Sequence, residues 1–186
     1  MTDGPINHPD LAPPALLGKA AVVVIIAAIL AMWFWIYLFA PRTNPDRFES
    51  TAYAEAAEPI CAVAQAAIND LPPGRFAETP QERAVGVREG TEITAQLIAD
   101  LKALRPLVTD PDELRILDAW FEDWEDGYLV DRWDHVERLE NATPDTDDRD
   151  LAFVIQERVE GGFYTRRIDG LANVNDMPSC VVPGDI

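Results

Sequence analysis

The chain has 186 residues, which is enough for one domain of ordinary size with short appendages. Acidic side chains outnumber basic ones by 33 to 15, so the formal net charge is −18 at pH 7. Because proteins bind phosphate backbones through clustered lysine and arginine, we expect no nucleic acid partner.

The N-terminal segment predicts a short leader and one membrane-spanning helix. Residues 1–18 are rich in proline and glycine, which is typical of irregular structure, and we expect this leader in the cytoplasm. Residues 20–40 read AAVVVIIAAILAMWFWIYLFA, with no charge and no proline. At about 1.5 Å per residue this run matches the ~30 Å core of a lipid bilayer. We therefore predict a transmembrane helix over residues 19–40 that contacts the bilayer through residues 20–40.

A cleaved signal peptide is the alternative interpretation of this run. The run is longer than a signal peptide needs, and Lys19 is the only basic residue before it. Pro41 also lies where cleavage after Ala40 would occur. We therefore expect an uncleaved, single-pass anchor.

Two rules disagree about the side of the membrane on which the C-terminal segment lies. Arg42 and Arg47 after the run, against Lys19 before it, weakly favour the cytoplasm. Cys61 and Cys180 are a lone pair, which favours a disulfide in an oxidising compartment, with two free buried thiols as the alternative. We give the cysteine pair more weight and predict a cytoplasmic N-terminus and an extracytoplasmic C-terminal domain.

After a linker at residues 41–46, residues 47–186 predict an acidic helical domain. Apolar residues at steps of three and four predict a first helix from about Pro45 to Asp70, bent or restarted at Pro59. Thr79, followed by proline and then Glu82, has the pattern of a capping box and begins a second helix, which ends at Arg105.

A third, long helix begins with the same pattern, in which Asp110 is the cap and Glu113 returns a hydrogen bond. It contains WFEDWEDGYLVDRWDHVERLE, residues 120–140, where tryptophans alternate with acids. A helical projection separates a solvated acidic face from an apolar face that we interpret as core. The apolar face holds Leu114, Leu117, Trp120, Phe121, Trp124, Tyr128 and Leu139.

The remainder of the domain predicts an acidic loop over residues 141–150, a fourth helix over residues 151–160 and a helical piece over residues 163–174. An extended tail follows. No useful strand-like alternation occurs. The predicted fold class is all-α: a transmembrane helix and a bundle of about four helices, with the tail pinned if Cys61 and Cys180 pair.

Three residues of the third helix do not fit a simple core face. Asp131 and His135, four residues apart, project onto the apolar side, where a buried carboxylate would favour a charged imidazole. We interpret them as a satisfied polar contact, with Arg132 or with another helix, in preference to a polar functional site. Trp133 falls on the acidic side, where it either packs under the tail or contacts a partner.

No catalytic, cofactor-binding or metal-binding motif is present in the sequence, and His8, the only other histidine, precedes the predicted span. We therefore expect no cofactor and no metal. Our first hypothesis is a non-enzymatic interaction or accessory protein with a partner in the membrane or cell envelope. The second is a small-ligand or pH-responsive sensor or enzyme centred on Asp131 and His135.

The string RIDGLANVNDMPSCVVPGD, residues 167–185, resembles the ending of an uncharacterised family of small helical proteins of high-GC Gram-positive bacteria. These proteins are extracytoplasmic, either single-pass or secreted. The segment PICAVAQAAINDLPPG is similar to their early cysteine and alanine-rich helix. The resemblance covers residues 55–186. It implies a Cys61–Cys180 disulfide and a secreted or membrane-tethered helical domain, and it implies no activity.

Overall fold

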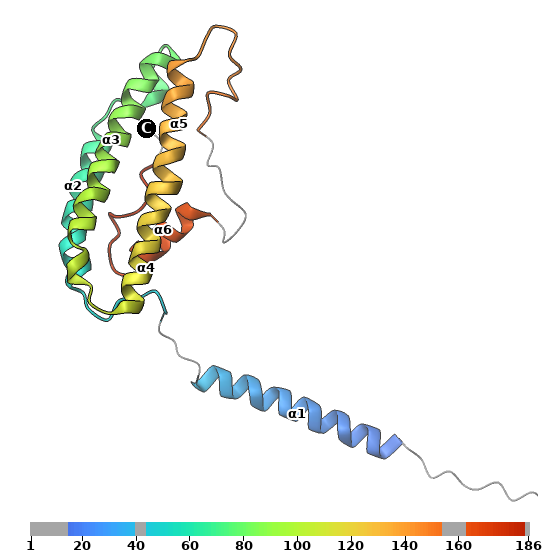
Figure 1. Cartoon of the computed structure of the whole chain (residues 1–186). Coiled ribbons are helices and arrows are strands. Elements are labelled where there is room, and N and C mark those ends of the chain that lie inside the picture. The colour runs from blue at the N-terminus through green and yellow to red at the C-terminus, as the bar shows by residue number, and fades with distance from the viewer. Residues whose placement is uncertain (1–14, 40–43, 154–162, 185–186) are drawn as a thin grey trace, which may run out of the picture. The chain divides into compact units, whose positions relative to one another are not determined.

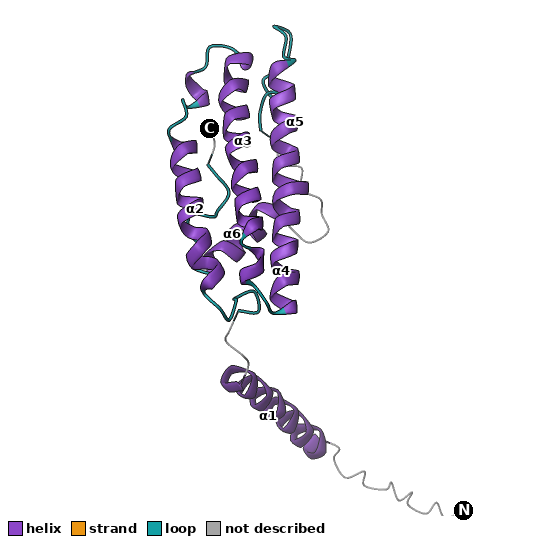
Figure 2. Ribbon diagram, turned by 60° about the vertical axis from the view of Figure 1, so that its left-hand side comes forward, coloured by secondary structure: helices purple, strands orange, loops and turns teal. Residues whose placement is uncertain are grey.

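The computed structural model describes residues 15–39, 44–153 and 163–184 of the chain. These residues form helices, turns and loops, and no strand occurs among them (Figure 2). The predicted all-α class is therefore confirmed. The chain divides into two compact units, Met1–Thr43 and Asn44–Ile186.

In the first unit, the described residues form one helix, α1, Ala15–Phe39. Its stretch Ala20–Phe39 is long and apolar enough to cross a membrane, and none of it is buried inside the protein. A signal sequence near the N-terminus can meet the same criteria of length and composition. The structure thus confirms an apolar helix of spanning length, and the role of this helix as an anchor belongs to the proposal made below.

The second unit is a bundle whose long helices lie side by side (Figures 1 and 2). The helix α3 packs against both α2 and α5, and α6 packs against α4 and the segment that joins α4 to α5. The elements in chain order are α2 (Ala52–Asn69), the 3₁₀ turn η1 (Gly74–Phe76), α3 (Pro80–Ala103), the 3₁₀ turn η2 (Arg105–Leu107), α4 (Pro111–Glu122), the π-helical η3 (Asp123–Tyr128), α5 (Leu129–Glu140) and α6 (Tyr164–Val174).

The predicted starts of the second and third helices are confirmed. The Thr79 side chain accepts a hydrogen bond from the Glu82 amide at 3.1 Å, and Asp110 accepts one from the Glu113 amide at the same distance. These bonds satisfy amides that a helix leaves unpaired in its first turn. The return hydrogen bonds expected from the two glutamate carboxylates were wrong, however. Glu82 accepts from the Glu78 amide at 2.8 Å instead of from the cap Thr79. Glu113 accepts from the Glu49 amide and so attaches the start of the domain to α4.

The predicted first helix begins later than expected and is not interrupted. Asp46 donates its amide to the Asn44 side chain, which stabilises a turn instead of a helix, and α2 starts at Ala52. Pro59 lies within α2, which continues through it. Because Pro59 is exposed, water can bond the carbonyl that its missing amide leaves unpaired.

The long third helix is present, but it contains a π-helical segment that the sequence did not predict. The segment Asp123–Tyr128 joins α4 to α5 without a break in the helical chain. A β-carbon at Gly127 would lie 2.9 Å from Cγ of Tyr164. Glycine therefore permits the Tyr164 ring of α6 to approach the backbone where the helix widens.

The aromatic side of this helix forms the core, as predicted. Trp124 has no exposed surface and meets Trp120 and Tyr128 edge to face, with ring centroids 6.1 and 5.3 Å apart. Of the seven residues assigned to the apolar face, Leu114 is half-buried and the other six are buried. The acids Glu122, Asp126, Glu137 and Glu140 are exposed.

The C-terminal tail is fixed to α2 by a disulfide. Cys61 and Cys180, 119 residues apart in sequence, are bonded, with their Cα atoms 5.0 Å apart and no exposed surface. Gln65, one turn further along α2, donates to the Val181 carbonyl at 2.9 Å. The predicted pinning of the tail is therefore confirmed.

The predicted fourth helix, residues 151–160, lies mainly outside the described residues. Its first residues, Leu151–Phe153, form a turn and not a helix. The following helical piece is confirmed as α6.

Candidate functional site

The polar residues predicted on the apolar face of the third helix are buried in α5. Asp131 is 5% exposed, Arg132 3% and His135 1%. The Asp131 carboxylate accepts a hydrogen bond from the hydroxyl of Tyr164 in α6. A partner on another helix was one of the expected arrangements, and it stabilises a carboxylate that burial alone would destabilise.

His135 does not carry the charge that its spacing from Asp131 suggested. Burial lowers the pKa of its imidazole to about 4, and the nearby positive charges of Arg83, Arg138 and Arg132 act in the same direction. The ring packs against Phe153, with centroids 5.4 Å apart, and its Nδ1 atom has no hydrogen-bond partner. The expectation of a charged imidazole was therefore wrong, because desolvation and the arginines outweigh one carboxylate.

Arg132 contributes to packing between helices. Its guanidinium donates to the Val87 carbonyl of α3 at 3.5 Å and lies 5.2 Å from the ring centroid of Phe153 and 6.0 Å from that of Tyr128. Such cation–π contacts compensate part of the cost of burying the charge. Among the described residues, no group of three or more histidine, cysteine, aspartate or glutamate side chains is placed to hold a metal ion.

Trp133 remains partly exposed, at 37%, on the outer side of α5. The Arg88 guanidinium of α3 lies 5.8 Å from its ring centroid and is ion-paired with Glu140. Trp133 therefore contacts a cation from the neighbouring helix. Its assignment as a partner contact stays a prediction.

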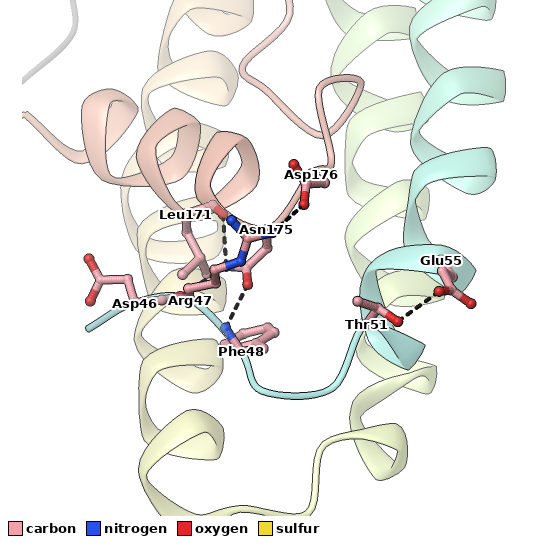
Figure 3. A network of polar contacts seen from close by, with 8 residues as sticks. All are labelled: Asp46, Arg47, Phe48, Thr51, Glu55, Leu171, Asn175 and Asp176. Carbon is pink, nitrogen blue, oxygen red and sulfur yellow. Dashed lines mark hydrogen bonds and ion pairs between the residues drawn. The ribbon is translucent and has the colours of Figure 1, made fainter. Parts of the chain in front are cut away.

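A network of polar contacts, here called the entry clasp, ties the start of the second unit to the end of α6 (Figure 3). Asn175, 6% exposed, accepts from the Phe48 amide at 2.8 Å and donates to the Asp46 carbonyl at 2.9 Å. Arg47 forms an ion pair with Asp176 at 2.7 Å. Three consecutive residues that enter the domain are therefore held by two consecutive residues near its C-terminus.

On the surface of α2 and α3, the structure shows an open apolar groove of about 460 Å³. Val63, at its rim, is 72% exposed, although an apolar side chain of this size gains from burial. We refer to this feature as the α2/α3 groove. It is lined by Pro59, Ile60, Val63, Ala64 and Ala67 of α2 and by Ile93, Gln96, Leu97 and Asp100 of α3.

The sequence analysis did not identify the α2/α3 groove. The apolar spacing that predicts the first helix does not distinguish Ala67, which is exposed, from Cys61, Ala64 and Ile68, which are buried. A signal was present, because α2 carries Val63 on the side away from Cys61 and is apolar around most of its circumference. Such a helix is expected to be covered on more than one side.

Comparison of the chain with protein family models, with curated proteins and with solved structures finds no match. The functional assignment therefore rests on the chemistry of the chain itself.

Proposed function

We propose that this protein is a single-pass membrane protein whose acidic helical domain lies outside the cytoplasm and acts there as a non-enzymatic interaction or accessory module. The observation that carries the proposal is the Cys61–Cys180 disulfide in the unit that follows the apolar helix α1. Disulfides form and persist in oxidising compartments and are rare in the cytosol.

The charge rule and the cysteine pair still point in opposite directions. Arg42 and Arg47 after the helix outnumber Lys19 before it by one, which weakly favours a cytoplasmic domain. The disulfide is the stronger indication, and it supports an extracytoplasmic domain.

The interaction role is supported by a contrast between the buried polar residues, which take part in packing, and the apolar surface, which is left exposed. Asp131 accepts a hydrogen bond from Tyr164 of α6, and His135 is neutral at physiological pH with its ring packed against Phe153, so both residues take part in packing the interior. With a pKa of about 4, His135 keeps the same charge state across the neutral range, which argues against a pH sensor working there. The α2/α3 groove, in contrast, leaves apolar surface in contact with water, as binding surfaces do.

The orientation is tested by labelling single added cysteines in the full-length protein with a membrane-impermeant maleimide in intact cells. Glu137 is exposed on α5, and we expect Glu137→Cys to react from outside. The matched variant Asn7→Cys, in the leader, is expected to react only after the membrane is permeabilised. The opposite pattern would show a cytosolic domain and would overturn the proposal.

The interaction role is tested by photo-crosslinking in native membranes, with a photoreactive residue placed in turn on each exposed face of the second unit. A discrete adduct from at least one face is expected. Absence of adducts from every face would contradict an interaction module. Turnover of a substrate by the purified protein would contradict the non-enzymatic part of the proposal.

A further inference from the structure

The α2/α3 groove has the dimensions and pattern of a site for a helix. Ile60, Val63, Ala64 and Ala67 are spaced i, i+3, i+4 and i+7 along α2, and Ile93, Gln96, Leu97 and Asp100 have the same spacing along α3. Each set therefore lies on one stripe of its helix. A seven-residue stripe is about 10 Å long, which spans two turns of a third helix placed in the groove. Helices dock in such grooves through anchors with the same spacing.

The charged side chains that line the groove or extend its two stripes are acidic. Asp100 lines the groove, and Glu89, one turn before Ile93, extends the α3 stripe. Asp70, one residue beyond the end of α2, lies three positions after Ala67 and extends the α2 stripe. All three acids are exposed. The two stripes therefore carry carboxylates beside their apolar residues.

No basic side chain of α2 or α3 is available to neutralise these acids. The helix α2 contains no lysine or arginine. In α3, Arg88 pairs with Glu140 and Lys102 with Glu125, which places both on the side that faces α5 and η3. Arg83, the third, is half-buried and near enough to His135 to lower its pKa.

A second copy of this chain fits the groove poorly. It would bring the same carboxylates into opposition across the interface, and like charges placed opposite one another are costly. The whole chain has a net charge of −18, which adds a general repulsion between copies. A helix with an apolar face flanked by cations fits better. Its apolar face can pack against the apolar residues of the groove, and its cations can pair with the nearby carboxylates.

We propose that the α2/α3 groove binds an amphipathic helix of a partner protein, with an apolar face flanked by lysine or arginine. The inference rests on the proposed interaction role and names the surface and the chemistry of the partner. Apolar contact with Val63 and Ile60 supplies the affinity, and pairing with carboxylates such as Asp100 sets the preference for a basic helix.

The test uses the oxidised full-length protein in nanodiscs of zwitterionic lipid and two designed helical peptides. The peptides share one leucine face, flanked in one by lysines and in the other by glutamates. Binding is measured by fluorescence anisotropy. We expect the lysine peptide to bind more tightly by about tenfold or more at low salt, with the difference reduced at high salt. Equal binding of the two peptides would overturn the charge complementarity.

Two groove variants and one control locate the site. Val63→Glu is expected to weaken binding of the lysine peptide by about tenfold, because it replaces an apolar side chain that lines the groove with a charged one. Asp100→Lys is expected to reduce the preference for the lysine peptide over the glutamate peptide. Val130, 47% exposed on α5, is the control, and Val130→Glu should leave binding unchanged. If Val130→Glu weakens binding as much as Val63→Glu does, the peptide is not in the groove and the proposal fails.

The failure of this inference can be told apart from failure of the proposed function. If a photoreactive residue at Val130 or Trp133 forms adducts in native membranes and one at Val63 does not, the domain is still an interaction module. The groove is then not its binding site, and the inference is refuted. Self-association of the full chain that is abolished by Val63→Glu would identify a second copy as the occupant and also refute the inference.

Discussion

Breaking the Cys61–Cys180 disulfide should destabilise the second unit strongly. The bond joins residues 119 apart, and in the chain-entropy model a closed loop of that size restricts the unfolded chain by ~4.9 kcal/mol. A typical domain unfolds with a stability of about 5–15 kcal/mol, so this is a large fraction of the total. With a urea dependence of about 2 kcal/mol per molar, the midpoint should fall by about 2.5 M.

The assay is urea unfolding of the full-length protein in detergent micelles, followed by the fluorescence of the buried Trp120 and Trp124. Oxidised protein, reduced protein and Cys61→Ala/Cys180→Ala are compared. Hydrogen exchange adds a local measure, because the Val182 amide, bonded to Asp169 at 2.8 Å, should exchange faster once the tail is released. An unfolding midpoint that is the same in all three samples would refute the loop-entropy reasoning.

Three further predictions concern packing, charge and the entry clasp. Gly127→Ala places a β-carbon 2.9 Å from an aromatic ring of α6 and should cost ~1–3 kcal/mol of unfolding free energy, whereas Gly170→Ala, with no atom within 4 Å, should be neutral or stabilising. Because the pKa of His135 is about 4 in the folded state and 6.5 in the unfolded chain, unfolding takes up a proton as the pH falls, and stability should decrease by ~2 kcal/mol between pH 7.5 and 5. Asn175→Ala leaves the buried Phe48 amide unpaired and should cost ~1–3 kcal/mol, with faster hydrogen exchange at that amide.

Each of these predictions has an outcome that would contradict it. Equal unfolding midpoints for Gly127→Ala and Gly170→Ala would show that the ring of α6 yields without cost. A His135→Gln variant should lose about 2 kcal/mol less than the native chain over the same pH interval, and an unchanged pH dependence would place the titration elsewhere. Full protection of the Phe48 amide in Asn175→Ala would show that the entry clasp does not hold the start of the domain.

Features that depend on local chemistry and on periodicity could be predicted from the order of residues alone. The apolar run of α1, the caps Thr79 and Asp110, and the aromatic face from Leu117 to Tyr128 follow from residue type and spacing along one helix. The structure confirms all of them. These features require no knowledge of what the helix packs against.

The contacts between residues from distant parts of the chain could not be predicted in this way, because they depend on how the helices pack. The close approach of Tyr164 to Gly127 joins α6 to the π-helical segment, and the entry clasp joins Phe48 to Asn175. The charge state of His135 depends on burial and on arginines from two helices, which spacing from Asp131 does not show. The α2/α3 groove is open because α2 has more apolar surface than the bundle covers. Local pattern shows that a side chain is apolar, but only packing determines whether another part of the chain covers it.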